Sequence, residues 1–377
     1  MRIGRAKKMT LHFIYVKGEG KHTPYAIANQ LTAYLSKFYT IKLYDWDDKT
    51  TIVPEAGDIL LGLPHHEKGT IFRNSFWHPH WGKKIIFSPI HHAMPWYNAH
   101  LDPYVEHTDD FLAICGKYWI DTWNDSFFSH WWPWITHLDL AVDPQDFPYL
   151  KEKINPSGQR KFLYIGNTSE YKGCDYLAQL ADANPHLSIG WIGPGAINSQ
   201  NIKSYGKLDL ASSEGRQLVA EYDFLLTCGR SDANPTTILE AASWGLVTIC
   251  TPQSGYYNED WFVNIPLYQV GKASAILNDL SICPEEKLRV LQQKARQTLE
   301  SHYNWQRFCR QVHQSLEAPS GQNRKYDNND VKCLVNRRHL KKMQFNPKAV
   351  SSSIIPGRLL RIPRKILSAV KRRFTAP

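Results

Sequence analysis

Two acidic side chains, Asp232 and Glu240, stand eight positions apart around the expected start of a helix at 235–244. Amide groups in the first turn of a helix have no backbone partner and attract anions, which places Thr236 and Thr237 where a phosphate would bind. Carboxylates accept hydrogen bonds from hydroxyl groups. The pattern predicts a ligand with a phosphate centre and hydroxyls at both ends, as in a nucleotide sugar. A capped surface helix with one exposed glutamate has the same local pattern, so these features alone do not decide the function.

Two glycine-containing segments precede this helix. An apolar stretch at 162–165 ends at Gly166, and the loop that follows contains Lys172 directly before Gly173. A later apolar stretch ends in the run Trp191-Ile192-Gly193-Pro194-Gly195. A loop lysine by itself is usually only solvated, so the significance of Lys172 depends on the segments around it.

Taken in order from residue 161 to 256, these segments resemble the donor-binding half of retaining glycosyltransferases of family 4, which have the two-domain GT-B fold. The resemblance rests on the acidic-x7-acidic spacing with Asn-Pro-Thr-Thr-Ile-Leu-Glu-Ala-Ala-Ser-Trp-Gly inside and after it. It also rests on the Gly-x5-Lys-Gly run from Gly166 and on the Gly-x-Gly turn after Trp191. It implies retaining transfer of a sugar from a nucleotide-diphosphate donor, with no cofactor and no metal.

The resemblance also assigns roles to individual residues. It implies that Asp232 is a catalytic residue that contacts the transferred sugar, and that the donor is bound by Gly166, Lys172, Thr236, Thr237 and Glu240, the last at the ribose. Two positions depart from the family. Asp232 stands where Glu is usual and has a shorter side chain. Asn167 stands where Arg is usual, which removes a bidentate phosphate contact, so another cation substitutes or the donor binds more weakly.

The first half of the chain contributes the remaining candidates for the donor site. Gly18 and Gly20 follow the first expected strand, where glycine lets the backbone approach a phosphate or sugar closely, although such a pair is often only a tight turn. The resemblance implies a histidine after the expected strand at 84–87, facing the transferred sugar. His91 is the expected catalytic residue there, with His92 as the alternate.

Histidine and tryptophan are concentrated before residue 141, which contains 12 of the 16 histidines and 9 of the 13 tryptophans. His65 and His66 are the next candidates for the role of His91. A metal site is the alternative reading of these histidines, but no pair has the i, i+4 spacing of a zinc hydrolase. Aromatic faces bind sugar rings, although most tryptophans pack in cores. The expected acceptor-binding residues are Trp77, Trp81 and Trp96.

Alternation of apolar stretches with helical patterns predicts an α/β fold, with two Rossmann-like domains facing a central cleft. The expected strands are 11–16, 41–44, 58–63, 84–87, 111–115, 162–165, 187–192, 224–227 and 246–250. The helix at 235–244 has Asn234 as its expected cap. Turn-forming residues place a linker at 143–160, between an N-terminal acceptor domain at 1–142 and a donor domain with terminal helices at 161–317.

Most of the positive charge belongs to a tail at 318–377, which is expected to be partly disordered. The tail has 15 Lys and Arg against 2 Asp, a net charge of +13. Because the whole chain has a net charge of +10, the rest of the chain has a net charge of −3. A basic helix with an apolar stripe near its end favours an anionic membrane surface as a partner. A tail that only adds solubility and a tail that binds nucleic acid are the alternatives, and nothing in the body of the chain indicates nucleic acid.

The function expected from these features is transfer of a hexose to a saccharide or lipid-linked acceptor, in the synthesis of a surface polysaccharide or glycolipid. Seven scattered cysteines and the lack of a long apolar run favour a cytoplasmic protein, at the inner face of the membrane where the tail binds. Two other functions stay open: a nucleotide-sugar epimerase of the same fold, and a non-catalytic carbohydrate-binding protein with a decayed donor site.

Overall fold

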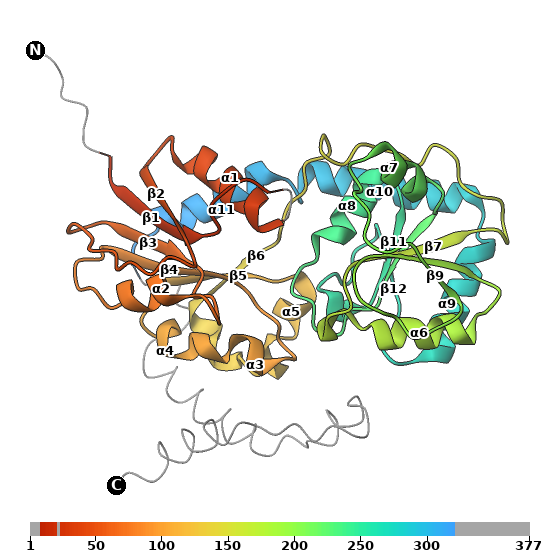
Figure 1. The fold of residues 1–377 in the computed structure, drawn as a ribbon, viewed down its shortest axis with the longest axis horizontal. Helices are drawn as coiled ribbons and strands as arrows, with labels where there is room; N and C mark the ends of the chain where they lie inside the picture. Colours follow the sequence, from red (N-terminus) through yellow and green to blue (C-terminus); the bar gives the residue numbers. More distant parts are fainter. Residues whose placement is uncertain (1–7, 21–22, 321–377) are drawn as a thin grey trace, which may run out of the picture. The chain divides into compact units, whose positions relative to one another are not determined.

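Two parallel sheets of six strands each organise the part of the chain that the structure describes (Figure 1). The computed structural model describes residues 8–20 and 23–320, without the side chains of residues 95 and 96. The first sheet has the order β2-β1-β3-β4-β5-β6, and the second has the order β12-β11-β10-β7-β8-β9. Both sheets belong to one compact unit of the chain. Because each half of the chain has its own six-stranded parallel sheet, the expected α/β fold with two such domains is confirmed.

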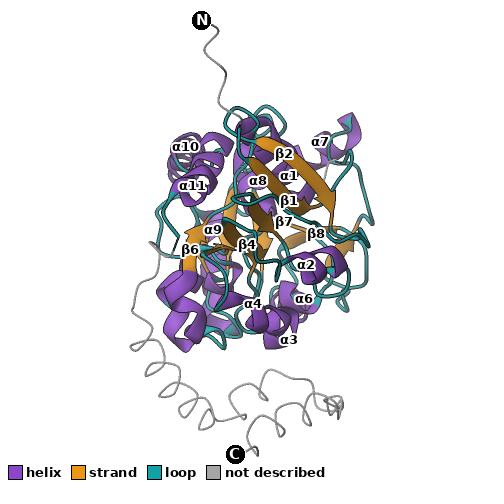
Figure 2. Ribbon diagram, turned by 90° about the vertical axis from the view of Figure 1, so that its left-hand side faces the viewer, coloured by secondary structure: helices purple, strands orange, loops and turns teal. Residues whose placement is uncertain are grey.

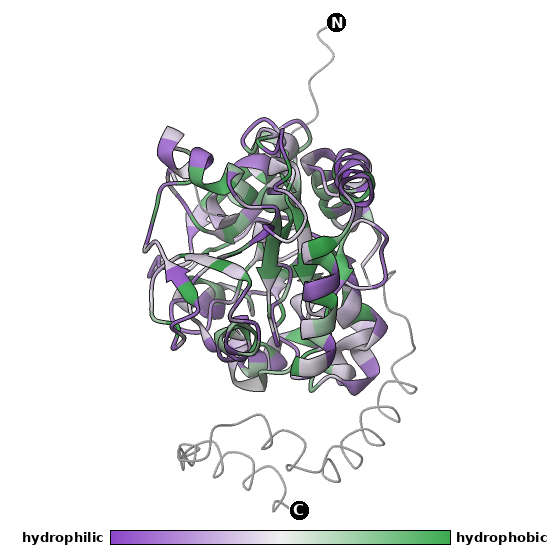
Figure 3. Ribbon diagram, turned by 90° about the vertical axis from the view of Figure 1, so that its right-hand side faces the viewer, coloured by the Kyte–Doolittle hydropathy of each residue, from purple (hydrophilic) through white to green (hydrophobic). Residues whose placement is uncertain are grey.

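Parallel pairing explains why the central strands are apolar along their whole length, because helices cover both faces of such sheets. All residues of β1, β3, β10 and β11 are buried, and Figure 3 shows hydrophobic residues gathered on the strands. The first sheet consists of β1 (Thr10–Tyr15), β2 (Thr40–Asp45), β3 (Ile59–Gly62), β4 (Lys83–Pro89), β5 (Asp110–Ile114) and β6 (Ile135–Leu138). The second consists of β7 (Lys161–Ile165), β8 (Ser188–Ile192), β9 (Ile202–Ser204), β10 (Phe224–Thr227), β11 (Val247–Cys250) and β12 (Val263–Asn264).

Helices lie on either side of the strands (Figure 2). Those of the first half are α1 (Thr23–Leu35), α2 (Thr70–Ser75), α3 (Pro95–Asn98), α4 (Asp102–Val105) and α5 (Lys117–Asp121). Those that follow β7 are α6 (Cys174–Ala183), α7 (Ser213–Ala220), α8 (Thr236–Trp244), α9 (Val270–Ile282), α10 (Glu285–Ser301) and α11 (Trp305–Glu317).

The last helix, α11, packs against the first sheet although it follows the second sheet in the chain. Phe308, Val312 and Leu316 lie one turn apart on one face of α11 and join the buried cluster that contains Leu11 and Ile85. Figure 1 shows α11 beside α1. The expected domain at 161–317 therefore includes a helix, α11, that packs with the other half of the chain. The spacing of apolar residues shows which face of a helix is buried, but it does not show which core receives that face.

The contact between α11 and the first sheet includes a buried lysine. The ammonium of Lys83, at the start of β4, donates to three main-chain carbonyls in and after the last turn of α11, at residues 315–318. These carbonyls have no partner within the helix. Lys83 therefore caps the C-terminal end of α11 and fixes it to the first sheet.

Replacing Lys83 by Met is expected to lower the free energy of unfolding by about 1–3 kcal/mol, because buried carbonyls lose a charged donor. Urea unfolding of the full chain measures the change. The control is Lys84→Met, the next residue of β4, whose ammonium lies 4.5 Å from the centre of the Phe76 ring instead. An equal loss of stability in the two variants would contradict the capping role.

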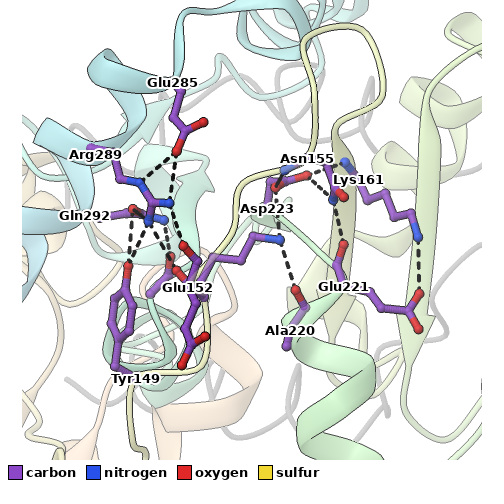
Figure 4. A network of polar contacts seen from close by, with 12 residues as sticks. Tyr149, Glu152, Asn155, Lys161, Ala220, Glu221, Asp223, Glu285, Arg289 and Gln292 are labelled. Carbon is purple, nitrogen blue, oxygen red and sulfur yellow. Dashed lines mark hydrogen bonds and ion pairs between the residues drawn. The ribbon is translucent and has the colours of Figure 1, made fainter.

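Residues 143–160 contain no helix or strand, yet their backbone is fixed by polar side chains (Figure 4). Arg289 of α10 donates to two carbonyls of this segment. Asp223 accepts from the main-chain and side-chain amides of Asn155, each at 2.8 Å. Asp223 also forms an ion pair with Lys151 at 3.0 Å, and both side chains are almost completely buried. The segment that joins the two sheets is therefore packed onto the second half of the chain.

Candidate functional site

An ion pair between Lys172 and Asp232 lies at the centre of the expected site, with 2.6 Å between Nζ and Oδ2. Lys172 ends a short 3-10 helix, Glu170–Lys172, after β7, and Asp232 lies in the loop after β10. The strands β7 and β10 are parallel neighbours, so both loops leave the same carboxyl edge of the sheet, where open α/β sheets bind ligands. The side chains of Lys172 and Asp232 are 16% and 8% exposed.

The surroundings of Lys172 keep its ammonium charged. Burial lowers the pKa of Lys172, but the Asp232 carboxylate and its hydrogen bond outweigh burial, and the net pKa is raised. The ring of Tyr171 also lies 5.3 Å from Nζ, at cation–π distance. A positive charge held in this way is available to stabilise a bound diphosphate.

The loop that ends at Lys172 is shaped by Gly173 and Asn167. Gly173 has a φ of +67°, and a Cβ there would lie 1.9 Å from the carbonyl oxygen of Cys228, so only glycine allows this approach to the end of β10. The side-chain Oδ1 of Asn167 accepts from the main-chain amide of Ser169 at 3.0 Å. The main-chain carbonyl of Asn167 accepts from the Tyr164 hydroxyl at 2.6 Å. Asn167 therefore braces the loop and supplies no charge.

The other expected glycines lie at the carboxyl edges of the two sheets. Gly166 follows β7 in the loop that leads to the ion pair, and its carbonyl accepts from the indole of Trp191 at 2.9 Å. Gly18 and Gly20 follow β1 and are exposed. A Cβ at Gly20 would lie 2.5 Å from the Tyr25 ring, so packing against that ring accounts for this glycine.

The start of α8 brings three of the expected donor-binding residues together. Thr236 is the first residue of α8, Thr237 the second, and Glu240 follows one turn later. Burial raises the pKa of Glu240, while a hydrogen bond with Thr236 and the charge of Lys172 partly offset it. The Thr236 hydroxyl also lies 2.9 Å from the hydroxyl of Thr23, at the start of α1 in the first half.

The prediction that Asn234 caps the N-terminus of this helix is wrong. The residue before α8 is Pro235, and no side chain among the described residues caps the start of the helix. The side chain of Asn234 instead accepts from the main-chain amide of Leu140 at 2.8 Å, in the segment after β6. Within residues 8–20 and 23–320, the first amides of α8 therefore have no side-chain acceptor, as a phosphate site requires.

His91 lies against the loop that contains Asp232. Its Nδ1 donates to the carbonyl of Ser231 at 2.9 Å, since a carbonyl can only accept. Burial lowers the pKa of His91; Asp232 and the Ser231 carbonyl oppose this change, whereas Lys172 and His66 add to it. The net pKa is below the ordinary value, so the imidazole is neutral at pH 7 with Nε2 as a hydrogen-bond acceptor.

His92, the alternate to His91, is a core residue. Its ring stacks on Trp119 at 4.8 Å and meets Trp123 edge-on at 4.6 Å. Burial lowers the pKa of His92 to about 3. The other candidates lie after β3, where the rings of His65 and His66 stack at 4.6 Å and His66 lies 6.3 Å from the Tyr97 ring.

The structure does not bring Trp77 or Trp81, two of the three expected acceptor-binding tryptophans, to this site. Trp77 and Trp81 precede β4, whereas His91 follows it, and the seven residues of β4 separate the two ends by roughly 20 Å. Trp77 packs on Tyr104 at 5.8 Å, and the indole of Trp81 donates to the Ser75 carbonyl at 2.8 Å. Trp96 belongs to α3, but its side chain lies outside the described residues.

Three further residues at this edge were not found from the sequence. The rings of Tyr97 and Tyr171 lie 5.1 Å and 4.7 Å from the ring of His91. Arg230 lies in the loop after β10 and pairs with Glu170, two residues before Lys172, at 2.9 Å. The sequence signals for them are position alone: Arg230 stands two residues before Asp232, and Tyr171 directly precedes Lys172.

Within residues 8–20 and 23–320, no group of three or more His, Cys, Asp and Glu side chains is arranged to hold a metal ion. Among the same residues, no helix combines the length and the apolar character needed to cross a membrane.

Comparison of the sequence with known protein families and with curated proteins finds no match. The fold, in contrast, is similar to solved structures. Sucrose-phosphate synthase from Thermosynechococcus elongatus gives a TM-score of 0.58 at 10% identity, over 81% of this chain and 98% of that protein. HepE of Anabaena, solved with UDP-glucose, gives a TM-score of 0.56 at 11% identity, over 82% of this chain and 99% of HepE.

TarM is another similar structure, with a TM-score of 0.54 at 10% identity, over 69% of this chain but only 55% of TarM. Similarity at such identities establishes the fold alone. The described part of the chain has the two-domain, parallel-sheet α/β architecture that its resemblance to GT-B glycosyltransferases implies.

Proposed function

We propose that the protein is a retaining glycosyltransferase of the hexosyltransferase type, which moves a sugar from a nucleotide-diphosphate sugar to a saccharide or lipid-linked acceptor. The observation that carries the proposal is the buried Lys172–Asp232 pair beside the uncapped start of α8. HepE, of similar fold, was solved with UDP-glucose, which favours the same class of donor here. A role in the synthesis of a surface polysaccharide or glycolipid follows from the acceptor class.

The donor is bound by groups that match its three parts. Glu240 accepts from the ribose hydroxyls, and the first amides of α8 donate to the diphosphate. Lys172 has three N–H donors, so it can keep its bond to Asp232 while it binds a phosphate oxygen. Asp232 is thereby placed next to the diphosphate, on the side where the sugar is attached.

The reaction breaks the bond between C1 of the sugar and the phosphate oxygen, and it forms a bond from C1 to the acceptor oxygen on the same face. The proton of the acceptor hydroxyl goes to the departing phosphate oxygen. Lys172 and the α8 amides stabilise the negative charge on the diphosphate, while Asp232 and Nε2 of His91 stabilise the positive charge on the sugar. We place the acceptor beside the rings of Tyr97 and Tyr171 rather than at Trp77 or Trp81.

A panel of UDP-, GDP- and ADP-sugars tests this function with the purified full chain. NMR monitors the reaction with and without saccharide acceptors, and release of the nucleoside diphosphate is the expected result. Inversion at a carbon of the donor sugar, without any acceptor, would instead establish an epimerase. Binding without turnover of any donor would establish a carbohydrate-binding protein with a decayed site.

Replacing Glu240 by Gln is expected to weaken donor binding by roughly 10-fold, because a neutral amide loses the charge-assisted bonds to the ribose. The fold should stay intact, since burial already raises the pKa of Glu240 and disfavours its charge. Calorimetry with the nucleoside diphosphate measures the change. Unchanged affinity would remove Glu240 from the site.

The tail at 318–377 is a separate proposal, and from residue 321 on it lies outside the described residues. We propose that its basic residues bind an anionic membrane surface, each contributing about 1 kcal/mol. Flotation with liposomes should carry the full-length chain upward as anionic lipid increases, but not a chain that ends at Leu316. Equal behaviour of the two chains would contradict membrane binding by the tail.

A further inference from the structure

Three consecutive carbonyls of the loop at 231–233 each accept a hydrogen bond from the first half of the chain. In chain order, the donors are Nδ1 of His91 at 2.9 Å, the indole N–H of Trp119 at 2.7 Å and the main-chain N–H of Gly116 at 2.8 Å. The loop contains Asp232, whose carbonyl is the one bound by Trp119. The backbone that carries Asp232 is therefore held from the first half of the chain, in addition to the bond from its own N–H to the Gln253 carbonyl in the second half, at 3.1 Å.

Contacts on either side of these carbonyls complete the attachment. The Ser231 hydroxyl accepts from the main-chain amide of Ala93 at 3.0 Å. At Gly116, a Cβ would lie 2.2 Å from the carbonyl oxygen of Gly255, so only glycine lets the two halves come this close. Both halves thus meet through main-chain groups around one short loop.

The ring of Trp119 is held by packing within the first half of the chain, independently of the loop. One face of the indole stacks on His92 at 4.8 Å with an interplanar angle of 5°. The N–H of Trp119 is consequently aimed at the carbonyl of Asp232 by packing within the first half. The side chain of Asp232 is shorter than the usual glutamate, so its reach depends directly on where its backbone lies.

We propose that Trp119 is a positioning residue for Asp232: its indole N–H fixes the peptide that directs the carboxylate toward the donor sugar. The proposal rests on the proposed function. It makes the donor site dependent on the acceptor half, because the loop has its catalytic geometry only while Trp119 is bound to it.

The test compares Trp119→Phe with Trp123→Phe in the full chain. Both indoles touch His92, and both donate a hydrogen bond to a carbonyl. The carbonyl that accepts from Trp123 belongs to Phe128, in the same half of the chain, at 3.2 Å. Probes are the nucleotide sugar with the highest turnover in the panel and its nucleoside diphosphate, beginning with UDP-glucose and UDP. Trp119→Phe should lower kcat by roughly 10- to 100-fold, as small misplacements do, while UDP affinity changes less than 2-fold.

A second readout separates positioning from a general loss of structure. The affinity that the sugar adds beyond UDP should disappear in Trp119→Phe and persist in Trp123→Phe, which should stay within 2-fold of the parent in kcat. Where Trp119→Phe does not fold, benzothienylalanine inserted at position 119 removes the N–H while keeping the indole outline, and the same loss is expected.

The outcomes distinguish this inference from the proposed function. Normal kcat in the position-119 variants, or equal losses in Trp119→Phe and Trp123→Phe, overturns the role of Trp119 and leaves the glycosyltransferase intact. A parent protein that neither binds nor turns over any donor overturns both.

Discussion

Turnover of the donor is expected to fall by about 100- to 1,000-fold when Lys172 is replaced by Met, the usual effect of removing one preorganised group from a developing charge. The structure adds a second effect. The Asp232 carboxylate, 8% exposed, loses its partner, and an unpaired buried charge of this kind costs about 3–5 kcal/mol of unfolding free energy. Single-turnover kinetics and urea unfolding measure the two effects separately.

A matched control is available in the same half of the chain. Lys151 and Asp223 also form a buried pair, at 3.0 Å, in the segment between the sheets. Lys151→Met should destabilise the protein to a similar extent, but the fraction that remains folded should keep its turnover. Equal turnover per folded molecule in the Lys172 and Lys151 variants would contradict a catalytic role for Lys172.

Replacing His91 by Ala is expected to lower turnover by about 100-fold and donor affinity by much less, because the imidazole acts where charge develops in the reaction. The pKa of His91 is below its ordinary value, so the parent protein should stay active through neutral pH. On the acid side its Nε2 gains a proton and becomes a donor, and turnover should fall. This acid limb should be absent from the pH profile of His91→Ala.

His80→Ala is the control for this experiment, since His80 is an exposed residue before the amino end of β4. It should retain both the turnover and the pH profile of the parent. An unchanged turnover in His91→Ala, or an acid limb that persists without His91, would remove His91 from the catalytic site.

Much of the fold was predictable because parallel strands covered on both faces are continuous apolar runs. Each expected strand corresponds to an observed strand, and its two ends differ from the observed ends by at most two residues. The strands that escaped prediction have weaker patterns: β6 contains Thr136 and His137, and β9 and β12 are two or three residues long and not fully buried. Placement of α11 also escaped, because helical periodicity does not identify the partner of an apolar face.

Within the site, the sequence indicates which loops share an edge of a sheet, but it does not indicate which contacts join the two halves of the chain. Lys172 and Asp232 could be placed together because β7 and β10 adjoin. The positions of Trp77 and Trp81 had a usable signal that the prediction did not apply: both precede a parallel strand, so they lie at the edge opposite His91. Trp119 is 113 residues from Asp232, and no local pattern predicts a hydrogen bond across that separation.

The most direct measurement of the central claim is the thermal unfolding midpoint of the full chain with each nucleotide-diphosphate sugar of the panel. A ligand that binds only the folded protein stabilises it by about 2.7 kcal/mol at 100 times its Kd. At least one donor should raise the midpoint of the parent protein, and the same donor should raise that of Lys172→Met or Glu240→Gln far less. A panel without any shift, or a shift that both variants retain in full, would contradict a donor site built on Lys172, Asp232 and Glu240.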